Sequence, residues 1–500
     1  MRRTRLSVGI VLALILAVVS TACSQPQEEV PEARPLVIGA TLEPDGLDMT
    51  TVAGAGTPFV LLRNVYETLI ELDGEGGFKP LLASEWTISD DLLEYTFTLD
   101  PAAKFASGED MVAQDVVDSF ERSRSEAATG SIRAKWDPVD TIEALDEDKV
   151  LVTLSQPSNM WLYDIAGPAG IVVDPAGVDT LDTQPAGSGP FTFVAWDQGN
   201  TLKLQGNPDY WGTATRFGEV TFQYYADPNA MNTAMLSGQL DIISNLTVPQ
   251  SIGQFEDEER FTIHEGTTDG EVVLGFNHRV PALQDLRVRQ AINHAIDREA
   301  LVDSAWGGKG PLIGSMVPPT DPWYEDLSDT YPYDPEKAKE LLAEAGYATG
   351  LSLRLRIPTL PYGPPAARFI QAQLGEVGID VEVEELDFAR WLDQVYGAHD
   401  YDMTIVSHVE GRDIGNFAQE DYYWGYSNPE FSELIEEADT GTEEEQVAKL
   451  QEAARLLAED AAANWLFLLP NIVITTTEIS GVQPNQTSLA FDLTTLAARS

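Results

Sequence analysis

The feature that most constrains this chain is a repeated switch, along almost its whole length, between the hydrophobic spacing of strands and that of helices. Apolar and polar residues alternate at Tyr95 to Leu99 and at Phe191 to Ala195, which is typical of half-buried strands. Elsewhere apolar residues recur every three or four positions, as from Val288 to Ile296. This alternation predicts an α/β protein with helices packed on sheets, and 500 residues predict two to four domains.

The same patterns predict three further elements. Leu36 to Thr41 has the composition of a strand, and apolar residues over 62–70 follow a helical stripe. Asp334 followed by Pro335 is typical of the start of a helix, with the aspartate as N-cap, and Gly346 is expected to end that helix.

The first residues have the pattern of an export signal. Arg2, Arg3 and Arg5 are followed by an uninterrupted apolar run from Gly9 to Val19, and then by three small residues before Cys23. An apolar run of this length, at about 1.5 Å per residue, is far shorter than the roughly 30 Å core of a bilayer. We therefore expect a cleaved signal rather than a membrane-spanning helix.

Cys23 is the one cysteine of the chain, so an internal disulfide is excluded. The small residues that lead to it resemble the bacterial lipobox, although Ser20 stands where that motif prefers an aliphatic residue. The resemblance implies a lipoprotein signal peptide over 1–22, lipidation of Cys23, and an extended tether over 23–35. The alternatives are an incidental cysteine with release of the protein, and, because of the paired arginines, twin-arginine instead of Sec export.

The charge balance limits the partners. There are 81 acidic residues against 30 basic ones, a formal charge of −51. Such a surface repels polyphosphates at long range, so a nucleic-acid partner is not expected. Solubility in salty surroundings is the simplest interpretation of the acidity, and recognition of a polycation is the alternative.

A search for catalytic motifs finds none. The glycine-rich segment 307–310 lacks the spacing and the Ser or Thr of a phosphate-binding loop, and Gly187-Ser188-Gly189 is not a nucleophile elbow. The five histidines show no zinc-ligand spacing. We therefore expect neither an enzyme, nor a metal site, nor a cofactor.

Several short motifs occur in a fixed order along the chain. They include Asn64 to Leu69, Lys79 to Trp86, Gly187 to Phe191, Asn207 to Trp211, and Asp285 to Ile292. In this order they resemble the solute-binding proteins of ABC importers, family 5, which includes oligopeptide, dipeptide and nickel receptors.

The resemblance implies a two-lobed clamp that hinges over a ligand. Lobe one would comprise 36–60, 186–271 and 471–500, with an inserted subdomain over 61–185. Lobe two would comprise 272–470. The chain would therefore cross between the lobes twice, at about Gly270 to Phe276 and Leu468 to Ile474.

The resemblance also implies where ligand is bound. Glu43 lies in the loop after the first strand, and Tyr401 to His408 is expected to be a strand whose following loop carries the amine-binding residues. In that loop Asp413 falls on the family's amine-binding aspartate and Asn416 fits the pattern, while Glu410 is a rival carboxylate. The other candidate ligand-binding residues are His408, Tyr423 and Trp424.

Each of these residues has a simpler interpretation. The loop acids can be solvated, the segment around Glu43 can be a plain turn, and the aromatic residues can be packed beneath the loop. Arg354 and Arg356 face the same side of a predicted strand, where they could bind a ligand carboxylate or pair with nearby acids.

We expect a monomeric lipoprotein on the outer face of the cytoplasmic membrane, in the cell envelope or periplasm. It would capture a small solute, most simply a peptide, and deliver it to the transmembrane subunits of an ABC permease whose ATPase subunits are separate. The same fold binding an oligosaccharide, a metal chelate or another metabolite is the first alternative. A secreted hydrolase is the second.

Overall fold

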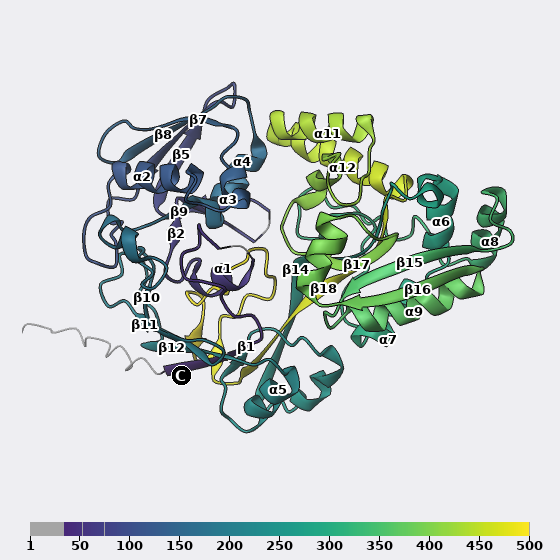
Figure 1. The fold of residues 1–500 in the computed structure, drawn as a ribbon. Coiled ribbons are helices and arrows are strands. Elements are labelled where there is room, and N and C mark those ends of the chain that lie inside the picture. The colour runs from purple at the N-terminus through teal and green to yellow at the C-terminus, as the bar shows by residue number, and fades with distance from the viewer. Residues whose placement is uncertain (1–34, 53, 75, 500) are drawn as a thin grey trace, which may run out of the picture.

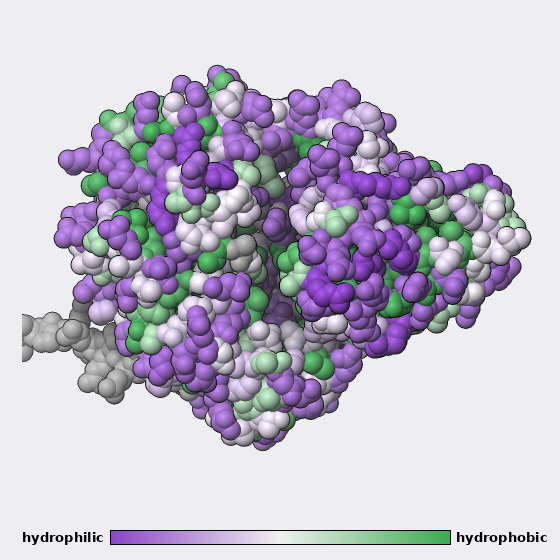
Figure 2. Space-filling view, viewed as in Figure 1, coloured by the Kyte–Doolittle hydropathy of each residue, from purple (hydrophilic) through white to green (hydrophobic). Residues whose placement is uncertain are grey.

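The structure is a computed structural model that describes residues 35–52, 54–74 and 76–499. The predicted signal peptide, Cys23 and the tether up to residue 34 lie outside these residues. Two lobes face each other in Figure 1, and Figure 2 shows the hollow that separates them. One mixed sheet runs through both lobes in the order β10-β11-β12-β1-β13-β18-β14-β17-β15-β16. The predicted two-lobed α/β fold is confirmed.

Lobe one is built on the first half of this sheet. β1 (Pro35–Ala40) pairs in parallel with β12 (Glu219–Tyr224) and β13 (Ile242–Ile243). β10 (Phe191–Asp197) and β11 (Thr201–Gly206) extend it antiparallel beyond β12. The strands confirm the predictions for the segments that begin at Leu36 and Phe191.

A subdomain beside lobe one carries a separate antiparallel sheet. Its order is β5 (Ala83–Ile88), β6 (Glu94–Leu99), β8 (Lys149–Leu154) and β7 (Val139–Ala144). Helices α2, α3 and α4 accompany this sheet, and the inward residues of β6 and α2 share one hydrophobic core. The helices span Ala113–Arg124, Gly130–Ala134 and Asn159–Ile165.

Lobe two has helices on both faces of its strands β17 (Met403–His408), β15 (Leu351–Pro358) and β16 (Ile379–Leu386). Residues of four helices share one core with alternate residues of the sheet. These are α6 (Leu286–His294), α7 (Arg298–Trp306), α8 (Pro335–Glu344) and α9 (Gly363–Glu376). Residues of α10 (Phe388–Trp391), α11 (Pro429–Thr440) and α12 (Glu443–Glu459) share a second core, with the opposite face.

Two long antiparallel strands connect the lobes. β14 (Phe261–Phe276) and β18 (Ala463–Thr476) pair with each other in both lobes, and their register shifts between Thr267 and Glu271. The break lies close to the crossings expected from the sequence. We propose that the hinge and the lobe boundaries lie here, because a shifted register leaves few ladder hydrogen bonds to resist bending.

The lobes touch at the far side of the cleft, where the N-terminal end of α4 meets the C-terminal end of α11. Asn159 Nδ2 donates to Ala438 O at 3.0 Å and to Gly441 O at 2.8 Å. Asp439 Oδ1 accepts from Met160 N at 2.8 Å. These contacts join residues about 280 positions apart, so the structure is that of a clamp with its lobes in contact.

The remaining elements are short. Strands β2 (Glu67–Thr68), β3 (Ile70–Leu72), β4 (Phe78–Pro80), β9 (Ile171–Val172), β19 (Ile479–Ser480) and β20 (Ala497–Ala498) form small pairs. Helices α1 (Gly56–Leu61) and α5 (Pro228–Leu236) belong to lobe one. Leu392–Gly397 continues α10 as a π-helical segment. Short 3-10 helices span Pro168–Gly170, Pro175–Thr180, Pro249–Phe255, Pro281–Gln284 and Asp413–Ala418. No helix among the described residues is long and apolar enough to cross a membrane.

One predicted helix is wrong. The stripe over 62–70 is buried as expected, but α1 ends at Leu61 and the segment forms a turn followed by β2 and β3. Arg63 has a φ of 72°, which no α-helix accommodates. The neighbouring Asn64 is buried. Its Nδ2 donates a hydrogen bond to Phe491 O at 2.9 Å, and its Oδ1 accepts one from Leu493 N at 3.1 Å. Tertiary hydrogen bonding therefore overrides the helical pattern.

The motifs of lobe one meet at one buried carboxylate. Glu67 accepts hydrogen bonds from Ser188 Oγ at 2.8 Å, Tyr210 Oη at 2.6 Å and Trp211 Nε1 at 3.0 Å. Three donors satisfy a side chain that is 1% exposed. These motif residues are structural, because they fasten the subdomain to lobe one rather than reach the cleft.

Candidate functional site

A cavity of about 310 Å³ lies in the cleft between the lobes. We call it the cleft cavity. The loop after β1 forms one wall, the loop after β17 forms the opposite wall, and the hinge segment of β14 lies between them. Its lining includes Leu42, Phe59, Tyr163, Ser244, Asn245, Thr247, Asp269, Val409, Gln486 and Leu489.

A second, more open cavity of about 470 Å³ lies on the other side of the loop after β17. We call it the loop pocket. It is lined from the subdomain by Lys135 and Met160 and from lobe two by the loop, α11 and α12. Three predicted site residues, Glu410, Asp413 and Asn416, line it together.

Four carboxyl groups gather between these cavities, and we call them the carboxylate cluster: Asp269, Glu271, Asp321 and Asp413. Asp269 lines the cleft cavity, and a gap of about 20 Å³ is lined by both Asp269 and Asp321. Glu271 is 1% exposed and Asp413 is 6% exposed. Neither oxygen of Asp413, nor Oε2 of Glu271, has a hydrogen-bond partner among the described residues. Burying such groups without partners is costly.

Burial raises the pKa of all four carboxyl groups. The pKa of Asp269 rises to about 7, through burial and then the nearby Asp413, with Arg412 opposing. The pKa of Asp321 rises to about 8, through burial and then Asp269. For Glu271 and for Asp413, too, burial is the main cause of a raised pKa. The cluster therefore holds protons near neutral pH unless a cation arrives to pair with it.

Arg412 lies beside the carboxylate cluster, and its side chain reaches across the cleft to the facing lobe. It has a φ of 61°, in the left-handed region. Its Nη2 donates to Gly76 O of the facing lobe at 2.7 Å, and its Cζ lies 4.5 Å from the ring centre of Tyr163 and 5.0 Å from that of Trp323. Burial lowers the pKa of this guanidinium, and the charges of Asp321 and Asp269 oppose the shift. Lys135, which lines the loop pocket with Asp413 and pairs with Asp164 at 2.9 Å, is the other cation beside the cluster, so the four carboxyl groups outnumber the cations near them.

His408 lies between an aromatic core and the cluster. Its Nε2 lies 2.9 Å from Tyr423 Oη, and its Nδ1 lies 3.5 Å from Asp413 Oδ2, which is too long for a normal hydrogen bond. Tyr423 and Trp424 are 2% and 1% exposed and pack against Phe417 and their neighbours. The aromatic residues therefore support the loop from beneath.

Glu43 is not brought to the other predicted residues. Its Oε1 accepts from Trp196 Nε1 at 2.8 Å and from Gly199 N at 2.7 Å, both in lobe one. These bonds fix the loop after β1 against β10. Its role as a ligand-binding residue stays a prediction, as does that of Asp413.

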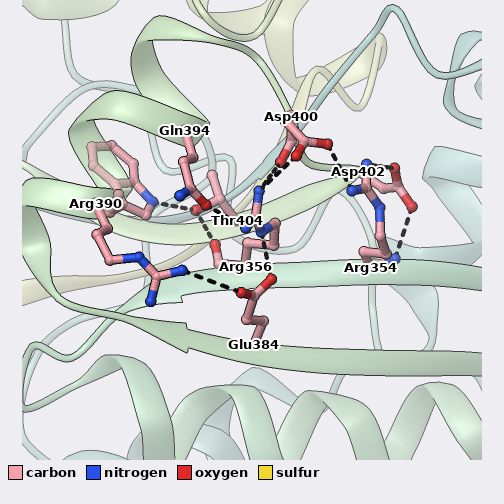
Figure 3. A network of polar contacts seen from close by, with 9 residues as sticks. Arg354, Arg356, Glu384, Arg390, Gln394, Asp400, Asp402 and Thr404 are labelled. Atoms are coloured by element: carbon pink, nitrogen blue, oxygen red, sulfur yellow. Dashed lines mark hydrogen bonds and ion pairs between the residues drawn. The ribbon is translucent and has the colours of Figure 1, made fainter.

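Arg354 and Arg356 form a separate network on β15 (Figure 3). Arg354 pairs with Asp400 at 2.7 Å and Asp402 at 3.1 Å. Arg356 pairs with Glu384 at 2.8 Å and Asp400 at 3.0 Å, and its Nη2 donates to Gln394 Oε1 at 2.6 Å. Both arginines are thus paired with acids of their own lobe.

Sequence reasoning missed most of the carboxylate cluster. Asp269 precedes Gly270 at the hinge of β14, and Asp321 lies in a proline-rich loop before α8. No local pattern unites segments so far apart. An acid in the middle of a long strand, beside a glycine, is the one signal that points to Asp269. Among the described residues no group of ligands that could hold a metal ion is found.

The two lobes, the connecting strands and the cavity between them define the class of clamp-like solute-binding proteins. A family model described as bacterial extracellular solute-binding proteins, family 5, matches residues 77–429, and the chain belongs to this family. The family consists of binding proteins of ABC importers rather than enzymes.

Relatives differ in what their names say they bind. The probable D,D-dipeptide-binding periplasmic protein DdpA of Escherichia coli is 30% identical over 465 residues, 86% of this chain and 88% of that protein. Heme-binding protein A of Haemophilus influenzae is 27% identical over 445 residues, 80% of each chain. The fold matches DppA of Helicobacter pylori in complex with the peptide STSA, with a TM-score of 0.80 and 24% identity, over 93% of this chain and 98% of that one.

Proposed function

We propose that this protein captures a short peptide with a free α-ammonium group in the interlobe cleft and delivers it to an ABC permease. The ammonium would pair with the carboxylate cluster, and Asp413 is its first candidate partner. Cys23 would carry the lipid that anchors a monomer to the outer face of the cytoplasmic membrane. Replacing Cys23 by alanine should then release the protein into the medium.

The observation that carries this proposal is the buried, unpartnered carboxylate of Asp413. It is 6% exposed, and neither of its oxygens has a hydrogen-bond partner among the described residues. Native proteins rarely leave such a group without a partner unless a ligand supplies one. A primary ammonium supplies three donors and the opposite charge.

The balance of charge supports a cationic rather than an anionic end of the ligand. The described lining of the cleft cavity contains Asp269 and no Arg, Lys or His. Arg412, beside the cluster, already donates to Gly76 O and lies against aromatic rings. Relatives named for a D,D-dipeptide and for a bound peptide agree with a peptide ligand, whereas the relative named for heme keeps other solutes open.

A thermodynamic cycle tests the proposal. Calorimetry would measure binding of Leu-Gly-Gly and N-acetyl-Leu-Gly-Gly to the wild type and to Asp413→Asn. Losing one partner of a buried charge pair costs about 2 to 5 kcal/mol, so either single change should weaken binding by about thirty-fold or more. The double change should add little, because both changes remove the same pair.

Glu410→Gln is the matched control, since Glu410 lines the same pocket but is exposed. A large loss in this variant, with none in Asp413→Asn, would move the amine site to Glu410. Additive losses in the cycle would contradict the proposed pair, and equal binding of the acetylated peptide would exclude recognition of an ammonium.

A further inference from the structure

Two large apolar side chains are exposed inside the cleft cavity. Leu42, in the loop after β1, is 41% exposed, and Val409, directly after β17, is 47% exposed. They come from opposite lobes and line the same cavity. Exposed apolar side chains that are gathered in a concave site usually mark a place where an apolar partner binds.

The rest of the cavity continues this apolar surface. Phe59 and Leu489 line it from lobe one, and Leu469 lines it from β18 at the hinge. Ser244 and Thr247 add hydroxyl groups. The Ser244 hydroxyl is bonded to Gly39 O at 3.0 Å, whereas Thr247 Oγ1 is buried and has no hydrogen-bond partner among the described residues. The exposed surface of the wall is thus mainly apolar, and polar side chains between the apolar ones, among them Asn245 and Gln486, can fix a ligand's orientation.

Asp269 connects this cavity with the carboxylate cluster. It lines the cleft cavity and also the small gap that it shares with Asp321 and Arg412. A ligand that lies in the cleft cavity and points its ammonium past Asp269 into the cluster therefore keeps the group next to that ammonium in the cleft cavity. For a peptide this group is the first side chain.

We propose that the cleft cavity is a specificity site that holds the first side chain of the ligand between Leu42 and Val409. This inference rests on the proposed function, and it names the ligand class as short peptides that begin with an aliphatic or aromatic residue. The cavity volume of about 310 Å³ is at the small end of the roughly 300 to 1,000 Å³ typical of ligand pockets. It suits one large side chain with its backbone rather than a long peptide.

The site also rejects acidic first residues. A carboxylate placed in the cleft cavity would lie beside Asp269 and would find no Arg, Lys or His in the described lining. A buried charge without a partner, next to a like charge, is strongly unfavourable. Selection against acids therefore follows from what lines the cavity.

The test compares three peptides, Leu-Gly-Gly, Ala-Gly-Gly and Asp-Gly-Gly, by calorimetry on the full chain. Leu-Gly-Gly should bind at least about ten-fold more tightly than Ala-Gly-Gly, the discrimination typical of an apolar pocket for missing methylene groups. Asp-Gly-Gly should bind more weakly than either.

Variants then test whether the side chains of the cleft cavity cause the preference for Leu-Gly-Gly over Ala-Gly-Gly. Leu42→Ala combined with Val409→Ala should reduce the preference for Leu over Ala to about three-fold or less. The matched control is Leu145→Ala combined with Val194→Ala, since these side chains are 52% and 51% exposed but are absent from the lining of the cavity. This control should keep the full preference. Val409→Lys should improve binding of Asp-Gly-Gly by about ten-fold, because it supplies the missing cation.

The possible outcomes separate the two proposals. If none of the three peptides binds, the peptide function fails and this inference fails with it. If all three bind with equal affinity, or if the control variant loses the preference as much as the cavity variant, the peptide function stands and the specificity site is refuted.

Discussion

Lobe two holds a network of charged groups on β15, and the hinge side of the cleft holds the carboxylate cluster. The two differ in whether their acids are paired with arginines. In the network two arginines meet Glu384, Asp400 and Asp402, and every one of these acids is within 3.1 Å of a guanidinium nitrogen (Figure 3). In the cluster two buried and two half-buried carboxyl groups lie near Arg412, and Asp413 lacks any hydrogen-bond partner among the described residues.

The pKa shifts have opposite directions in the two places. Hydrogen bonds from Arg354 lower the pKa of Asp400, whereas burial raises the pKa of Asp269 to about 7 and that of Asp321 to about 8. The network is therefore complete without a ligand and contributes to stability. The cluster lowers stability until a cation binds, which is typical of a binding site.

The largest effect is expected from breaking the network. Arg356 is 6% exposed and donates to Glu384, Asp400 and Gln394. Arg356→Ala should lower the free energy of unfolding by about 3 kcal/mol, because hydrogen bonds to charged groups contribute about 1.5 to 3 kcal/mol and packing is also lost. Urea denaturation would measure this. Peptide affinity should not change, and a large loss of affinity would show that the network belongs to the site.

The second prediction concerns a substitution that hinders closure of the lobes and so leaves the carboxylate cluster exposed to water. Gly76 has a φ of 86°, and an added Cβ would lie 2.3 Å from Pro322 Cδ of the facing lobe. Gly76→Ala should hinder closure and weaken peptide binding by about ten-fold, equivalent to about 1.4 kcal/mol. Gly74→Ala is matched, since its φ is 87° but nothing lies within 4 Å of an added Cβ. Equal affinities for the two variants would contradict a cleft that closes at this contact.

The third prediction compares how stability depends on Asp321 of the carboxylate cluster and on Asp402 of the network. The raised pKa of Asp321, about 8, means that the folded protein holds a proton that the unfolded chain releases near pH 4. Stability is therefore lost as pH rises towards 8. Asp321→Asn should raise the free energy of unfolding by at least about 1 kcal/mol at pH 9, while the two proteins should be nearly equal at pH 4, where the folded and the unfolded chain both hold the proton.

Asp402→Asn should do the reverse. Its carboxylate accepts from Arg354 N at 2.8 Å and from Arg354 Nη2 at 3.1 Å, so removing its charge should lower stability at pH 9. Unfolding curves at the two pH values would test both variants. A stabilising Asp402→Asn, or a destabilising Asp321→Asn, would remove the distinction between the network and the cluster.

Local patterns were sufficient to predict most of the elements but not the cluster. β6, β10 and α8 could be predicted because their hydrophobic periods and caps lie within a few residues of each other. The conformation of segment 62–70 could not be predicted in this way. Its hydrophobic pattern indicates only that the segment is buried, whereas its conformation depends on a hydrogen bond from Asn64 to a residue 427 positions away. Family resemblance pointed to the loop of Asp413. Asp269 has one local signal, the neighbouring glycine in a long strand, and Asp321 has none, and only the fold brings β14, the loop before α8 and the loop after β17 together.

The most direct measurement is the number of protons exchanged when Leu-Gly-Gly binds at pH 7. Calorimetry in two buffers of different ionisation enthalpy gives this number. Because the carboxyl groups of the cluster hold protons in the free protein and an ammonium favours their charged forms, binding should release protons to the buffer. N-acetyl-Leu-Gly-Gly should release none. Binding of Leu-Gly-Gly with no proton release, or with proton uptake, would contradict a cluster that receives the ligand's ammonium.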